Sequence, residues 1–177
     1  WIIFIFLSHR SRVEKPWLYA LALGSFAFIS IHTALIAGGL FLIEAKCRLP
    51  QWKALAINER HKLVAAAFIF AVATGLIFFC CYPPPDGNFV TGSGSLATVD
   101  SISIKMLGEA LAGQGIISIS TFYIIANYVI RSKFGWHLIV PLVLLMGLFG
   151  YKYANLWHAG IIFCHILLVL MLAIQSS

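Results

Sequence analysis

Two long segments without a charged side chain limit what this chain can fold into. Residues 17–43 and 63–82 contain none, and each is at least as long as the ~20 residues that a helix needs to cross a hydrocarbon core. Only 10% of the 177 residues are charged, and the mean hydropathy is +0.95. Backbone groups inside a bilayer must be satisfied within their own segment, which favours helices. The sequence therefore predicts an all-α, integral membrane helical bundle.

The apolar segments predict about five transmembrane helices, at approximately 17–45, 62–82, 103–131, 137–154 and 157–176. Residues 1–7 are apolar but too short to cross, so we expect a truncated sixth span there. Gly24 and Gly38 in the first span are expected to let a neighbouring helix approach closely. A chain of this length and composition is expected to form a single transmembrane domain over residues 1–177.

The basic residues predict the orientation of the chain in the bilayer. Loops 46–62 and 131–136 contain five and two of the twelve Lys and Arg residues, whereas loop 83–102 contains only the acids Asp86 and Asp100. Short loops rich in Lys and Arg favour the cytosolic side. We therefore expect a multi-pass protein with 46–62 and 131–136 on the cytosolic or matrix side. The net charge of +6 is explained by topology, so the expected partner is the lipid bilayer and not nucleic acid.

Two histidines open predicted spans on this basic side. His61 and His137 each lie about one helical turn below the same membrane face, where two imidazoles can hold one flat haem between them. The flanking Arg60, Lys62 and Arg131 would lie at the depth at which haem propionates emerge. The alternative is that both histidines are interfacial residues that extend into the headgroups.

Two further histidines lie deeper in the predicted spans. His32 and His165 are candidates for a second haem pair. Alternatively, each ring makes an interhelical hydrogen bond to a carbonyl or to a hydroxyl such as that of Ser30 or Thr33. His9 lies in a basic loop and is expected to be solvated.

The third predicted span contains the only pair of charged residues inside a span. Lys105 and Glu109 are four residues apart, so they share a helix face and can pair. Ionisable residues within a membrane often mark proton or ion routes. The same span has a row of small residues that predicts a tight helix–helix seam, formed by Gly108, Ala112, Gly115 and Ser118.

The order of helices and histidines resembles the cytochrome b561 family, the transmembrane di-haem electron carriers. The segment HKLVAAAFIFAVATGL resembles the second core helix of that family, in which a ligand histidine precedes a glycine by 14 residues, here His61 and Gly75. The resemblance implies that the first four predicted spans form the core and that His61 and His137 ligate haem b. His32 matches the first core helix loosely, because IHTALIAGG replaces the usual His-Pro start.

The third predicted span departs from that family pattern. Ile104 or Lys105 occupies the position of the outer-haem ligand, so the resemblance implies one haem b and leaves a second open, which would need His158 or His165. The expected function is one-electron transfer, with a small reductant such as ascorbate as an implied donor and oxidoreductase activity left open. One rival is a non-enzymatic accessory subunit that docks other membrane subunits through its small-residue face. Another is a proton or ion path.

Overall fold

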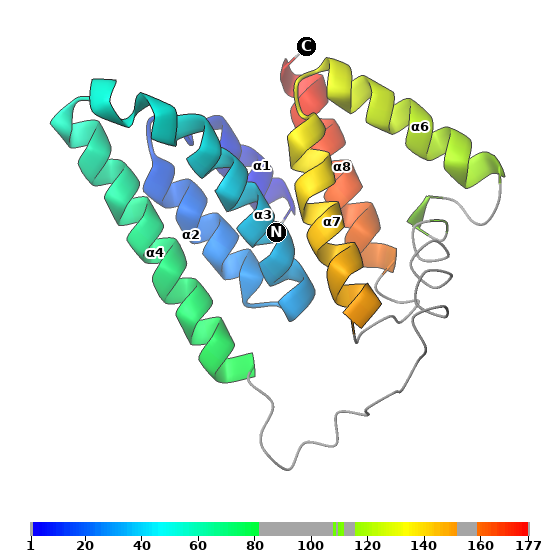
Figure 1. The fold of residues 1–177 in the computed structure, drawn as a ribbon, viewed down its shortest axis with the longest axis horizontal. Helices are drawn as coiled ribbons and strands as arrows, with labels where there is room; N and C mark the ends of the chain where they lie inside the picture. Colours follow the sequence, from blue (N-terminus) through cyan, green and yellow to red (C-terminus); the bar gives the residue numbers. More distant parts are fainter. Residues whose placement is uncertain (1, 82–107, 109, 112–115, 152–158, 177) are drawn as a thin grey trace. The chain divides into compact units, whose positions relative to one another are not determined.

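A computed structural model describes residues 2–81, 108, 110–111, 116–151 and 159–176. Every element within these ranges is a helix (Figure 1), which confirms the all-α prediction for them. The chain divides into two compact units, residues 1–82 and 83–177. Among the described helices, one is long and apolar enough to cross a membrane by length and composition, over Ile57–Ile77. The number of spans and the single transmembrane domain stay predictions.

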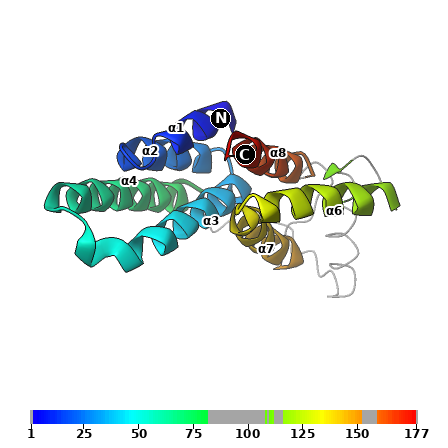
Figure 2. The ribbon, with the colours of Figure 1, turned by 90° about the horizontal axis from the view of Figure 1, so that it is seen from above.

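Unit 1 is built around α2. Its elements are α1 (Ile2–Arg10), α2 (Pro16–Ala27), α3 (Ile31–Arg48), the 3-10 helix η1 (Leu49–Ala54) and α4 (Ile57–Cys81). Helix α2 contacts α1, α3 and α4, and Figure 2 shows it between α1 and α4. Eight of its twelve residues are buried, including Tyr19 and Leu23. Apolar residues lie on all sides of α2, so its sequence does not predict which side is buried. The core of unit 1 therefore lies where α1, α3 and α4 pack against α2.

The single span predicted over 17–45 is wrong, because the chain turns at residues 28–30 and forms the α2–α3 hairpin (Figure 1). Ser30 caps α3: its Oγ accepts a hydrogen bond from the Thr33 backbone N–H at 3.2 Å, and its own N–H donates to Thr33 Oγ1 at 2.9 Å. Such a reciprocal capping box satisfies two backbone donors at a helix start. It lies in an uninterrupted apolar segment, so hydropathy alone does not reveal it. The 12-residue α2 is shorter than a bilayer-spanning helix.

Gly24 brings α2 and α4 into close contact. A Cβ atom at this position would lie 2.8 Å from the Cβ of Ala73, closer than two carbon atoms approach without displacement. The close approach predicted for Gly24 is thus confirmed. At Gly38, by contrast, no atom lies within 4 Å of the added Cβ.

Unit 2 contains α6 (Ile116–Arg131), α7 (Gly135–Tyr151) and α8 (Ala159–Ser176), each of which contacts the other two. Helices α7 and α8 run antiparallel, side by side (Figure 1). They overlap the spans predicted over 137–154 and 157–176, and α4, which begins five residues earlier than predicted, overlaps the span over 62–82. The helices predicted at these three places are confirmed as helices.

The continuous helix predicted over 103–131 is wrong. The Oγ of Ser118 donates to the carbonyl oxygen of Gly108 at 3.2 Å, although ten residues of straight helix rise ~15 Å. One continuous straight helix therefore cannot contain both residues.

The same contact also corrects the predicted seam of small residues. Gly108 and Ser118 are joined by this hydrogen bond, so they do not lie along one face of one continuous helix. Ala112 and Gly115, the other two members of that row, lie outside the described residues.

The turn between α6 and α7 places Lys133 in a left-handed conformation. Its φ is +67°, and no other non-glycine residue among those described has a positive φ. The Phe134 N–H bonds to the Val129 carbonyl at 3.0 Å, and the Lys133 N–H bonds to the Ile130 carbonyl at 3.1 Å. This is the Schellman pattern, in which glycine usually occupies the left-handed position. Lys133 therefore imposes a backbone strain at the end of α6.

Replacing Lys133 by glycine is expected to stabilise the protein by about 1 kcal/mol, because glycine has no Cβ to oppose the left-handed conformation. The free energy of unfolding in mixed detergent micelles measures the effect. Lys133→Ala is the matched control, since it removes the same charge and keeps the Cβ. Equal stabilisation by both variants would show that the charge, and not the backbone, is responsible.

Candidate functional site

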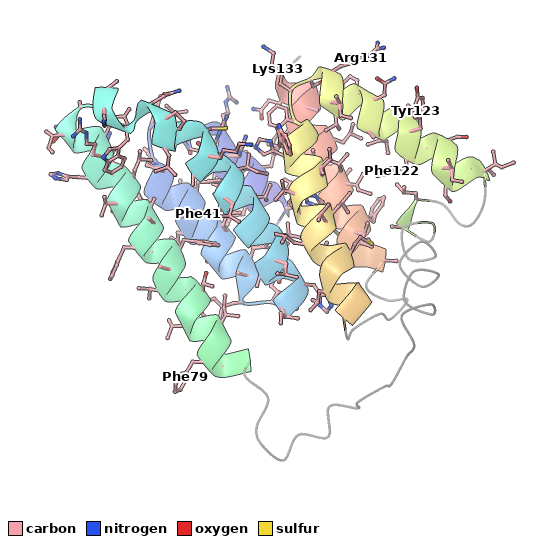
Figure 3. All side chains as sticks on the ribbon, viewed as in Figure 1. Phe41, Phe79, Phe122, Tyr123, Arg131 and Lys133 are labelled. Carbon is pink, nitrogen blue, oxygen red and sulfur yellow. The ribbon has the colours of Figure 1, made fainter. Side chains whose placement is uncertain are left out.

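His61 lies on an uncovered side of α4. The side of α4 that faces α2 includes the buried residues Ala66 and Ile77. The opposite side, which we call the His61 face, consists of exposed residues on one helical surface: His61, Ala65, Phe68, Val72, Gly75 and Phe79. Phe79 is 86% exposed and points away from α2 (Figure 3). A Cβ added at Gly75 would have no atom within 4 Å, so this surface is open next to the glycine.

His137 lies in the first turn of α7 and is half-buried. Its ring centroid is 4.9 Å from that of Phe134, and the two ring planes are inclined by 50°. Like His61, it lies near the beginning of its helix, as the sequence predicts. The two histidines belong to different units, so their pairing across one haem stays a prediction.

The three basic residues near these histidines have different surroundings. Arg60 donates from Nε to the Leu55 carbonyl at 3.0 Å and from a terminal nitrogen to the Lys53 carbonyl at 2.8 Å, which orients it over the loop before α4. Lys62 pairs with Glu59 at 2.8 Å. Arg131 is exposed at the end of α6 (Figure 3). The guanidinium of Arg60 retains three of its five N–H donors beyond these two contacts.

His165 connects α8 to α7. It is 2% exposed, and its Nε2 lies 3.3 Å from the carbonyl oxygen of Leu138. Leu138 directly follows His137, so this bond connects α8 to a point near the start of α7. The interhelical hydrogen bond, one of the two alternatives for His165, is therefore present, and a ligand role for Nε2 would require it to break.

Replacing His165 by leucine is expected to destabilise the protein by ~1–2 kcal/mol, because the buried hydrogen bond to the Leu138 carbonyl of α7 is lost. Chemical denaturation of the two proteins in micelles measures the effect. An unchanged free energy of unfolding would mean that this bond does not stabilise the packing of α8 on α7.

His32 lies in the first turn of α3, not in the middle of a span, because the predicted span is divided. It is buried, and Ser30 and Thr33 hydrogen-bond to one another around the start of the helix. His32 belongs to unit 1 and His165 to unit 2, so a second haem between them stays a prediction.

His9 is buried, although its basic surroundings predict a solvated side chain. It is 3% exposed, and its ring contacts the edge of Tyr19 with a centroid distance of 5.3 Å. The physical reason is that α1 packs on α2, which covers this end of α1. The basic residues near His9 in the sequence do not predict this packing of α1 on α2.

Lys105 and Glu109, the proposed ion path, lie outside the described residues, as do His158 and Ile104. Among the described residues, no three His, Cys, Asp or Glu side chains are grouped to hold a metal ion. A bis-histidine haem needs only two ligands from the protein, so this finding does not bear on it.

The chain matches no protein-family model, no curated protein and no solved structure. Its function is therefore inferred from its own residues and their positions.

Proposed function

We propose that this protein is a multi-pass membrane protein that binds haem b between His61 and His137 and transfers single electrons. The observation that supports this proposal is the His61 face of α4, an exposed helical surface that combines an accessible imidazole with apolar side chains. The basic loops 46–62 and 131–136 are proposed to face the cytosol or matrix.

The residues of the His61 face fit a haem. A porphyrin needs an accessible imidazole nitrogen and apolar contacts over its faces, and Phe68 and Val72 offer such contacts within three turns of His61. The open space beside Gly75 leaves room on the same surface. In unit 2, His137 is half-buried and its ring packs against the ring of Phe134.

Each residue has a defined role in this proposal. His61 and His137 would hold the iron as neutral imidazoles, and the haem would supply a one-electron redox centre there. Arg60 and Arg131, with Lys62, would neutralise the propionates by charge-assisted hydrogen bonds. His165 is a positioning residue, because its Nε2 contacts the carbonyl oxygen of Leu138, the residue that follows His137. A small-molecule reductant is the proposed electron donor.

One observation favours a second function, that of an accessory subunit without haem. The outward surface of α6 is exposed and apolar, and a partner subunit could cover it; its residues include Ile116, Ile117, Ile119, Tyr123 and Ile124. His165 acts as an interhelical hydrogen-bonding residue, the role that this interpretation gives to all the histidines.

The haem content of the purified protein distinguishes the two functions. After expression with ample haem, the pyridine haemochrome assay is expected to give one haem b per chain. A colourless protein that co-purifies with other membrane subunits would contradict the electron carrier and support the accessory subunit.

A further inference from the structure

Unit 1 contains an apolar pocket that the proposed haem site does not use. It has a volume of about 210 Å³ and lies among α2, α3, η1 and α4. Its walls include the aromatic rings of Tyr19, Phe41 and Trp52 and the side chains of Leu63 and Ala67.

Aromatic stacking fixes one wall of this pocket. Phe41 extends from α3 toward α4 (Figure 3), and its ring stacks on Phe70 with a centroid distance of 4.3 Å and an interplanar angle of 11°. The volume is smaller than the ~300–1,000 Å³ of pockets that enclose a drug-sized ligand. The pocket therefore fits a segment of hydrocarbon chain and not a macrocycle.

The polar rim of the pocket is a cluster of two arginines and one glutamate. The Nε of Arg12 lies 3.2 Å from Glu44 Oε2, and the Nε of Arg48 lies 2.6 Å from Glu44 Oε1. Arg48 also donates to the Arg12 carbonyl at 2.9 Å, and Arg12 donates to the His9 carbonyl at 2.9 Å. These bonds connect the α1–α2 turn to the end of α3. Two cations share one carboxylate, so the rim has a net charge of +1.

Both arginines retain hydrogen-bond donors. Each guanidinium has five N–H groups, and the contacts at Glu44 and at backbone carbonyls use two on each residue. The side chains of Arg12 and Arg48 are 29% and 18% exposed, so a ligand can reach them without unfolding the cluster. The remaining donors suit the oxygen atoms of a phosphate group.

We propose that this pocket binds one anionic phospholipid. The phosphate accepts hydrogen bonds from Arg12 and Arg48, and the first part of one acyl chain enters between Phe41 and Ala67. The net positive rim selects an anionic headgroup over a zwitterionic one, since a base near the surface contributes ~1 kcal/mol to the binding of anionic lipid. This inference rests on membrane residence, which is part of the proposed function, and does not depend on haem.

Trp52 provides the probe for the test. A variant that keeps only this tryptophan is reconstituted in phosphatidylcholine bilayers; the other four tryptophans, replaced by Phe, are Trp1, Trp17, Trp136 and Trp157. Bromine on the acyl chains quenches a nearby indole. At equal mole fraction, brominated phosphatidylglycerol is expected to quench Trp52 more strongly than brominated phosphatidylcholine. Equal quenching by the two lipids would overturn the lipid site, and no quenching by either would overturn membrane residence and the site together.

Two further variants connect the quenching to the pocket. Ala67→Phe fills the pocket and is expected to abolish the excess quenching, while Ala71→Phe, on an exposed position one turn later in α4, retains it. Arg12→Gln is expected to reduce the preference for the anionic lipid roughly fivefold. Inorganic phosphate is expected to leave the quenching unchanged. Displacement by phosphate, or an unchanged excess in Ala67→Phe, would contradict a site that holds the acyl chain.

Discussion

Replacing His61 by glycine is expected to remove nearly all bound haem, and imidazole added to the variant is expected to restore the haem spectrum. The substitution removes the proposed iron ligand, and His61 is exposed, so a small imidazole can reach the vacated position. Optical titration of His61→Gly with haem, in the presence and absence of imidazole, measures both steps. His137→Gly is expected to behave in the same way.

A matched control separates ligation from folding. Asn58 is exposed near the start of the same helix, and Asn58→Gly is expected to keep its haem. If His61→Gly retains a full haem complement, or if imidazole fails to restore the spectrum of a folded variant, His61 is not the ligand.

The second large effect is expected at Gly24, where an added methyl group would press on α4. Gly24→Ala is expected to lower the free energy of unfolding by ~1–3 kcal/mol, because its Cβ would lie 2.8 Å from that of Ala73. In an ordinary helix, replacing glycine by alanine stabilises by ~1 kcal/mol. The steric contact is therefore expected to reverse the sign of the change in the free energy of unfolding. Denaturation in mixed micelles measures the change.

Two variants test whether the contact with Ala73 is the cause. Gly38→Ala introduces the same methyl group where no atom lies within 4 Å, and it is expected to be neutral or stabilising. Ala73→Gly, combined with Gly24→Ala, is expected to recover most of the lost stability. Destabilisation of equal size at Gly24 and Gly38 would contradict the close packing of α2 on α4.

Hydropathy predicts best those helices that have charged or turn-forming residues near their ends. Helix α4 begins beside Glu59 and Arg60, and α7 begins after the turn at Lys133. The α2–α3 break was not predicted, because a capping box at Ser30 interrupts an apolar segment without changing its hydropathy. The contact between Gly108 and Ser118 excludes a continuous helix through both residues, and no local sequence pattern specifies that contact.

The positions of His61 and His137 near helix starts follow from the sequence, since each comes directly after a basic or aromatic interfacial residue. The burial of His9 and His165 does not, because it results from packing between helices.

The reduced-minus-oxidised visible spectrum of the purified protein tests directly whether it carries electrons on haem. We expect a sharp b-type α-band that appears on addition of a small reductant and that is absent from a His61→Gly, His137→Gly double variant. A flat difference spectrum from folded protein expressed with ample haem would contradict the proposed electron carrier.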